Sequence, residues 1–191
     1  MKKSLLLMLL STVSWGAIAQ TCISDISKSA PNSRFITNEN GTVEDLKTGL
    51  IWMRCPLGKV WNSANNECTG KTASFSWQPA LNEAHLINSS KLHRLHKFGG
   101  YENWRLPSIK ELISLVEKAC HTPTLNTKAF PNFIDLGEWS IPETTATLWS
   151  STATGSGDSV LVFNSVFGET LIQSPNMAGG DYGALLVTDS K

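Results

Sequence analysis

The sequence has no surplus of charge of either sign. Its 16 Lys and Arg residues are matched by 16 Asp and Glu residues, whereas nucleic-acid-binding domains carry a clustered basic excess. A glycine-rich phosphate loop is missing, and so is the Gly-x-Ser-x-Gly word of a nucleophile elbow. Internal repeats, charged tails and clear linkers are missing as well. We therefore expect a single domain that binds no nucleic acid and carries no recognisable catalytic motif.

Long apolar runs are missing except at the start of the chain. Lys2-Lys3 precedes an apolar segment that begins at Leu5, and Ala17-Ile18-Ala19 is a small-x-small cleavage site. The run is too short for a spanning helix. We predict a signal peptide over residues 1–19, so that the chain is secreted or periplasmic with no transmembrane segment after cleavage. A lipoprotein signal at Cys22 is the alternative, although the residues before it lack a good lipobox.

Cysteine is scarce, and its even number is informative. An exported chain with four cysteines is expected to form two disulfides, for which three pairings exist. We favour Cys55 with Cys68, because they bracket a short loop. This choice leaves Cys22 with Cys120, which would tie an N-terminal arm, residues 20–33, to the rest of the domain. No Cys-x-x-Cys occurs and the spacings fit no zinc module, so we predict no metal site and no cofactor.

Residues 99–117, which read GGYENWRLPSIKELISLVE, carry the densest local signals. Pro107 ends an extended segment, because the residue before a proline avoids the helical region. Ser108 and Glu111 then have the spacing of a capping box. Apolar residues follow at helical intervals and predict a helix from Ser108 to near Cys120 with one buried face: Ile109, Leu112, Ile113 and Val116.

Inside this stretch, Trp104 and Leu106 are predicted to be core side chains. Arg105 lies between them, and we expect it to be held by hydrogen bonds or by an acidic partner.

The remaining elements alternate between short strands and turns. Asn40-Gly41 is a strong hairpin signal after a strand at Arg34–Thr37, and Ser76 begins a second helix with Pro79 in its first turn. Further strands are predicted at residues 50–55, 148–151, 160–163, 166–172 and 184–187. The pattern predicts an α+β domain with two helices packed on a small twisted antiparallel sheet.

Four sequence motifs in a fixed order resemble those of the Lcl C-terminal domain family, which is named after the terminal domain of a bacterial collagen-like adhesin. They are GTVEDLKTGLIWMRC, GGYENWRLPSIKEL, AFPNF and LWSSTA, and the last contains Trp149 and Ser150. The resemblance covers roughly Arg34 to Val187, and we assign residues 34–191 to this domain. It implies a C-type-lectin-like fold. The WRLP motif, residues 104–107, with the helix that follows it, is also similar to a motif in formylglycine-generating enzymes, which share that fold.

Calcium-dependent lectins of this fold resemble one another in two motifs. The first is Glu-Pro-Asn or Gln-Pro-Asp, and the second is Trp-Asn-Asp. This chain has Ser174-Pro175-Asn176 and Trp149-Ser150-Ser151 instead, so most oxygen ligands for a sugar-chelating calcium ion are missing. A loop cation near Asp158 or Asp181 stays open. The family's usual Arg-Leu-Val-Arg ending is replaced by residues 184–187, Ala-Leu-Leu-Val.

A basic turn follows the second helix and supplies the candidate ligand contacts. Five of its seven residues are basic: Lys91, His93, Arg94, His96 and Lys97. No carboxylate or cysteine partner for the two histidines is evident in the sequence, which argues against a metal site. The turn is either an ordinary solvated connection or an anion-binding patch for acidic or sulfated glycans.

These observations predict an exported, non-catalytic, lectin-like binding module, adhesin-like, whose partner is a glycan or an envelope or surface protein. Exposed tryptophans could add stacking platforms for sugar rings. A structural or partner-binding component of a surface assembly is the alternative. An enzyme of the formylglycine-generating kind is less favoured, because that chemistry needs two reactive cysteines and we expect all four in disulfides.

Overall fold

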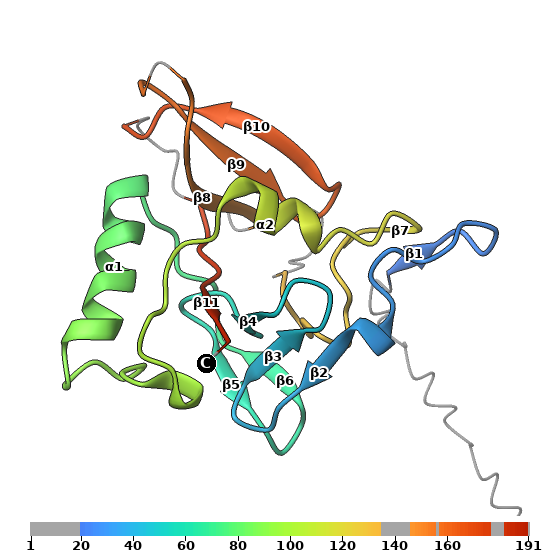
Figure 1. The fold of residues 1–191 in the computed structure, drawn as a ribbon, viewed down its shortest axis with the longest axis horizontal. Helices are drawn as coiled ribbons and strands as arrows, with labels where there is room; N and C mark the ends of the chain where they lie inside the picture. Colours follow the sequence, from blue (N-terminus) through green and yellow to red (C-terminus); the bar gives the residue numbers. More distant parts are fainter. Residues whose placement is uncertain (1–19, 135–145, 156, 177–181, 191) are drawn as a thin grey trace, which may run out of the picture.

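The computed structural model describes residues 20–134, 146–155, 157–176 and 182–190, and the predicted signal peptide lies outside them. Two antiparallel sheets, two short ribbons and two α-helices make up these residues (Figure 1). The α+β expectation is confirmed at this level. The single sheet that we predicted is wrong, because the strands divide into separate small sheets.

The lower sheet in Figure 1 has the order β11-β4-β3-β2. Its strands are β2 (Phe35–Thr37), β3 (Thr42–Asp45), β4 (Leu50–Met53) and β11 (Val187–Asp189). The predicted hairpin at Asn40-Gly41 is confirmed: Gly41 has φ 84°, and the Asn40 side chain accepts a hydrogen bond from the Thr42 amide at 3.1 Å.

The upper sheet has the order β10-β9-β8, from β8 (Thr147–Ala153), β9 (Val160–Asn164) and β10 (Glu169–Gln173). The strand predicted over residues 166–172 is confirmed from Glu169 onward, but residues 166–168 are not part of it. The Asn164 side chain accepts hydrogen bonds from the amides of Val166 and Phe167, and Gly168 has φ 77°. These residues therefore form the turn between β9 and β10.

The segment before β11 joins the two sheets. Gly183 exchanges backbone hydrogen bonds with β8, and the carbonyls of Ala184 and Leu186 accept from Leu57 and Met53. Regular pairing begins only at Val187, so the strand predicted over residues 184–187 is displaced toward the C-terminus. Because this segment must bond to both sheets, it cannot extend either one.

Two disulfides fasten the short ribbons. In the first ribbon, β1 (Thr21–Cys22) pairs with β7 (Cys120–His121), and the disulfide Cys22–Cys120 links the two strands. In the second ribbon, β5 (Val60–Asn62) pairs with β6 (Glu67–Thr69), and Cys68 of β6 forms a disulfide with Cys55. The pairing is the one favoured from the short loop.

We expect removal of either disulfide to lower the free energy of unfolding by about 2–4 kcal/mol, mainly because the unfolded chain gains conformational entropy without the cross-link. The Cys22–Cys120 link should contribute more, because its sequence separation is 98 against 13 for Cys55–Cys68. Urea unfolding of the two double Cys→Ser variants measures both effects. Equal losses would show that loop length does not decide the difference.

The helices are α1 (Trp77–Ser89) and α2 (Ile109–Ser114). Both halves of the predicted capping box at Ser108 and Glu111 are present. The helix is shorter than predicted, however, and Ile113 is exposed rather than buried. Beyond Ser114 the chain turns away, because the Glu117 carboxylate binds the amides of the N-terminal arm.

Large aromatic side chains fill the interior between the sheets and helices. The most deeply buried are Trp52, Trp104, Trp149, Phe130 and Phe163. In the part of the chain that the structure describes, no helix is long and apolar enough to cross a membrane.

Candidate binding surface

The basic turn of residues 91–97 follows α1 directly and leads into the 3₁₀ turn η2 (Phe98–Gly100). Lys91, Arg94 and Lys97 are exposed, and Leu92 between them is 97% exposed. The structure therefore brings three of the predicted contact residues to the surface around a protruding apolar side chain.

The two histidines of the turn face the protein instead. His93 Nε2 lies 3.1 Å from Glu83 Oε1 on α1, and its Nδ1 accepts a hydrogen bond from the Leu95 amide. His96 Nδ1 lies 3.1 Å from the carbonyl oxygen of Ile87. The expectation that these histidines lack a carboxylate neighbour is wrong for His93. Both rings are half-buried and hold the turn against α1.

Acidic residues offset part of the positive charge. Lys97 Nζ lies 2.6 Å from Glu102 Oε1, with both side chains more than half exposed. Such a surface pair is weak and can be exchanged for another anion at little cost. Glu83 beside His93 is the second acid, so Lys91 and Arg94 carry the positive charge that no described acid balances.

Arg94 differs from the other three arginines of the chain, all of which have fixed partners. Arg34 binds Asp45, and Arg105 binds Glu111 through both of its terminal nitrogens at 2.9 and 2.7 Å. Arg54 donates to two backbone carbonyls and lies 4.0 Å from the Trp61 ring centroid, while burial lowers its pKa to about 10. Only the guanidinium of Arg94 is both exposed and without a partner in the described chain.

The WRLP stretch is structural rather than exposed. Trp104 and Leu106 are 1% and 2% exposed, and the Pro107 carbonyl accepts a hydrogen bond from Ser151. Arg105 has the acidic partner that we expected. Its hydrogen bonds to Glu111 raise the pKa of Arg105. Burial alone would raise the pKa of Glu111, but hydrogen bonds from Arg105 and Ser108 together with the Arg105 charge outweigh burial and lower it.

The WSS motif, residues 149–151, is structural as well. Trp149 Nε1 donates to the Phe75 carbonyl at 2.6 Å, and Ser150 Oγ donates to the Leu161 carbonyl at 2.6 Å. Neither side chain is exposed.

No tryptophan in the described ranges is fully exposed. Trp61 and Trp77 are half-buried, and Arg54 lies over the Trp61 ring, while Trp139 lies outside these ranges. An open stacking platform for sugar rings is therefore not formed by the described tryptophans alone.

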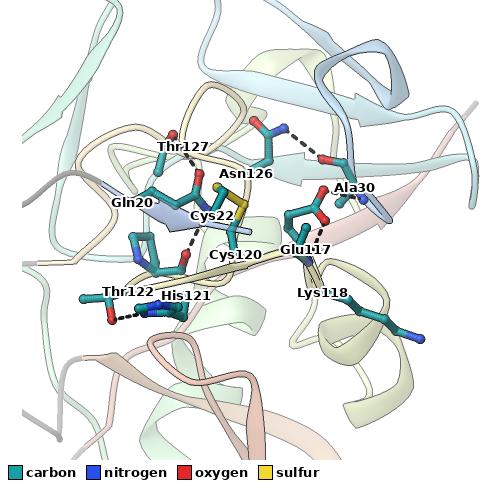
Figure 2. Close-up of a disulfide and its surroundings, with 12 residues drawn as sticks. Gln20, Cys22, Ala30, Glu117, Lys118, Cys120, His121, Thr122, Asn126 and Thr127 are labelled. Carbon is teal, nitrogen blue, oxygen red and sulfur yellow. Dashed lines mark hydrogen bonds between the residues drawn. A yellow bond between two sulfur atoms is a disulfide. The ribbon is translucent and has the colours of Figure 1, made fainter. Parts of the chain in front are cut away.

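A polar cavity of about 190 Å³ under the N-terminal arm was not predicted from the sequence. Figure 2 shows its surroundings, where Gln20 Nε2 donates to the carbonyls of Pro123 and Leu125 and Asn126 donates to that of Ala30. The lining comprises Gln20, Lys28, Ala30, Asn32, Glu117, Cys120, Asn126, Thr127 and Lys128. It combines residues about 90 to 100 positions apart, which no local pattern connects.

Glu117 organises this region as a structural anion. Its carboxylate accepts backbone amides from Ser29, Ala30 and Ala119 at 2.9, 2.9 and 3.0 Å. Burial alone would raise the pKa of Glu117, but these hydrogen bonds outweigh it and lower the pKa. The carboxylate is therefore committed to the arm and is not free to bind a ligand.

Side chains that could support metal binding or thiol chemistry are few in the described ranges. No set of three or more His, Cys, Asp or Glu residues gathers there, while Asp181, one of the two residues left open for a loop cation, lies outside them. All four cysteines are in disulfides, so the two reactive thiols of formylglycine-type chemistry are not present.

Comparison with known protein families gives a match over most of the chain. A sequence model described as the Lcl C-terminal domain matches residues 41–184. A search of curated proteins found no relative that matches the chain. The matched range includes the basic turn and the WRLP stretch, but it begins after the N-terminal arm.

Proposed function

Because the chain belongs to the Lcl C-terminal domain family, we propose that it is an exported, non-catalytic, adhesin-like binding module that recognises acidic or sulfated glycans at the cell envelope or surface. The family is associated with adhesins rather than with catalysis. The two disulfides support an oxidising compartment outside the cytoplasm. A C-type-lectin-like arrangement of the helices and small sheets is part of this proposal.

The observation that carries the proposal is the free guanidinium of Arg94. Arginine binds planar carboxylates and sulfates through two parallel hydrogen bonds, and an arginine without an internal partner retains that capacity. Lys91 adds a second charge without a described partner, and Lys97 a third that is held only by an exposed ion pair. The two histidines fix the turn on α1, so that these cations project from a supported loop.

Binding by three exposed cations should be weak per contact and sensitive to salt, because each charge is screened. We expect Lys91→Ala/Arg94→Ala/Lys97→Ala to elute from a heparin column at clearly lower salt than the wild type. We expect the melting temperature to change little, since all three side chains are exposed.

The matched control is Lys28→Ala/Lys118→Ala/Lys128→Ala. It removes the same charge from exposed lysines near the arm, which lies on the other side of the molecule from α1 (Figure 1). If both triple variants elute together, retention reflects net charge and the basic turn is an ordinary connection. A neutral glycan column distinguishes recognition of acidic groups from general carbohydrate binding.

A further inference from the structure

Strand β10 is the longest open sheet edge in the described part of the chain. The other edge of its sheet, β8, is covered by Gly183, and β11 in the lower sheet is covered by Arg105. β10 pairs through all five residues with β9 and has no described neighbour on its outer side. It forms the outer rim of the molecule in Figure 1.

The exposed side chains of this hairpin are unusually apolar for a solvated edge. Phe167 in the turn is 59% exposed, and Leu171 and Ile172 in the strand are 44% and 65% exposed. Open edges of soluble proteins are normally protected by charged side chains, above all lysine, by proline or by a bulge within the strand. β10 has no lysine, proline or bulge, since its sequence is Glu-Thr-Leu-Ile-Gln and its register with β9 is continuous, and its one charged residue, Glu169, stands at its start.

We propose that β10 pairs antiparallel with β10 of a second copy of this chain, joining two three-stranded sheets edge to edge. The main-chain amides and carbonyls along the free edge supply the hydrogen bonds, as in strand addition. Gly168 at one end and Pro175 just beyond the other limit the pairing to this short strand. Without Lys2 and Lys3 of the predicted signal peptide, the exported chain has 16 − 2 = 14 basic residues against 16 acidic ones, so its net charge is small and adds little repulsion between copies.

The charges of the strand select one arrangement. Glu169 is its only charged residue, and an antiparallel register centred on Leu171 places Glu169 opposite the partner's Gln173. It also places Leu171 opposite the partner's Leu171 and Thr170 opposite the partner's Ile172, so apolar surface is covered. An in-register parallel pairing would instead place the two Glu169 carboxylates against each other, which is unfavourable.

Sedimentation velocity of the purified, oxidised, exported chain over a concentration series tests the proposal. The wild type should show a reversible monomer–dimer equilibrium. Leu171→Lys and Leu171→Glu should each raise the dimer dissociation constant about tenfold or more, because like charges then face each other across the centre of the ladder. An equimolar mixture of the two variants should recover the dimer, because lysine then faces glutamate.

Leu86→Lys is the control, since Leu86 is exposed to a similar degree, 47%, and belongs to α1, which lies apart from β10 in Figure 1. It should dimerise like the wild type. Circular dichroism and melting confirm that the Leu171 variants fold. The proposal is overturned if the wild type stays monomeric, if Leu171→Lys dimerises like the wild type, or if mixing the two charged variants fails to restore association.

Discussion

Trp104→Ala is expected to lower the free energy of unfolding by roughly 3–5 kcal/mol, because it removes a large, fully buried side chain. Trp104 is 1% exposed and meets Phe98 and Tyr101 edge-on, with ring centroids 6.0 and 5.9 Å away. Its indole N–H donates to the Phe98 carbonyl at 3.2 Å. Truncation would therefore leave a cavity and an unused acceptor.

The same residue supports the basic turn. The Asn88 side chain at the end of α1 bonds both the amide and the carbonyl of Trp104, at 2.9 and 2.7 Å, and Phe98 follows the turn directly. Trp104 thus packs against both ends of the loop that carries Arg94. Urea unfolding followed by circular dichroism measures the loss of stability.

Trp104→Phe and Trp61→Ala are the comparison variants. The first keeps much of the buried volume and should retain heparin binding, while the second truncates a half-buried tryptophan and should cost less than Trp104→Ala. A Trp104→Ala protein that unfolds like the wild type and loses only glycan retention would contradict the structural role and make Trp104 a binding residue.

Local features were predictable because their partners are near in sequence. The capping box joins Ser108 to Glu111 three positions away, and the hairpin at Asn40-Gly41 depends on a two-residue signal. The short-loop disulfide, Cys55–Cys68, belongs to the same class. For the capping box and the hairpin, one turn of backbone fixes the geometry, so the sequence pattern is sufficient. For the disulfide, the two cysteines are only 13 positions apart, so the loop that they close is short.

The errors arise where distant residues decide the outcome. The helix after Ser108 ends early because Glu117 binds Ser29 and Ala30, which are 88 and 87 positions away. The sheets divide because residues 182–187 bond to both of them. Periodicity contains no information about such partners, so helix length and sheet number could not be derived from it.

In the candidate site, too, local features could be read from the sequence, whereas contacts between distant residues could not. The cluster of basic residues is visible in the sequence, but the sequence could not show that Glu83 would lie beside His93 on an adjacent helix, or that three arginines would be occupied elsewhere. The lack of an internal partner that sets Arg94 apart from the other arginines is therefore a property of the fold and not of its local sequence.

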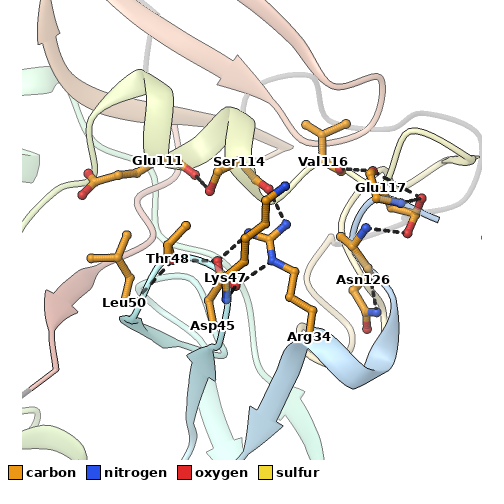
Figure 3. Close-up of polar contacts among 12 residues, drawn as sticks. Arg34, Asp45, Lys47, Thr48, Leu50, Glu111, Ser114, Val116, Glu117 and Asn126 are labelled. Atoms are coloured by element: carbon orange, nitrogen blue, oxygen red, sulfur yellow. Dashed lines mark hydrogen bonds and ion pairs between the residues drawn. The ribbon is translucent and has the colours of Figure 1, made fainter. Parts of the chain in front are cut away.

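Asp45→Asn is expected to cost about 3–5 kcal/mol, because it leaves the Arg34 guanidinium buried without a counter-charge. The carboxylate accepts from Arg34 Nε and Nη2 at 2.6 and 2.5 Å and from Thr48 Oγ1 at 2.7 Å, while Arg34 Nη1 donates to the Ser114 carbonyl at 2.7 Å. Figure 3 shows the guanidinium between the β3 end and the last residue of α2. The pair therefore ties the lower sheet to the helix.

Its pH dependence follows from the same contacts. Burial alone would raise the pKa of Asp45, but hydrogen bonds from Arg34 and Thr48 and the Arg34 charge lower it below its ordinary 3.8. The associated stability is fully present above that ordinary value and is lost as the pH falls through the lowered pKa. Asp45→Asn should consequently flatten the acid limb of the stability curve, measured by urea unfolding between pH 7 and pH 3.

Two further variants separate burial from charge pairing. Arg105→Gln breaks the more exposed pair with Glu111 and should cost only about 0–1 kcal/mol. Arg34→Met/Asp45→Leu removes both buried charges and should be less destabilising than Asp45→Asn, because no lone ion remains inside. If Asp45→Asn costs no more than Arg105→Gln, the buried pair does not hold α2 against the sheet, and Glu117 with the disulfide near it must position that helix instead.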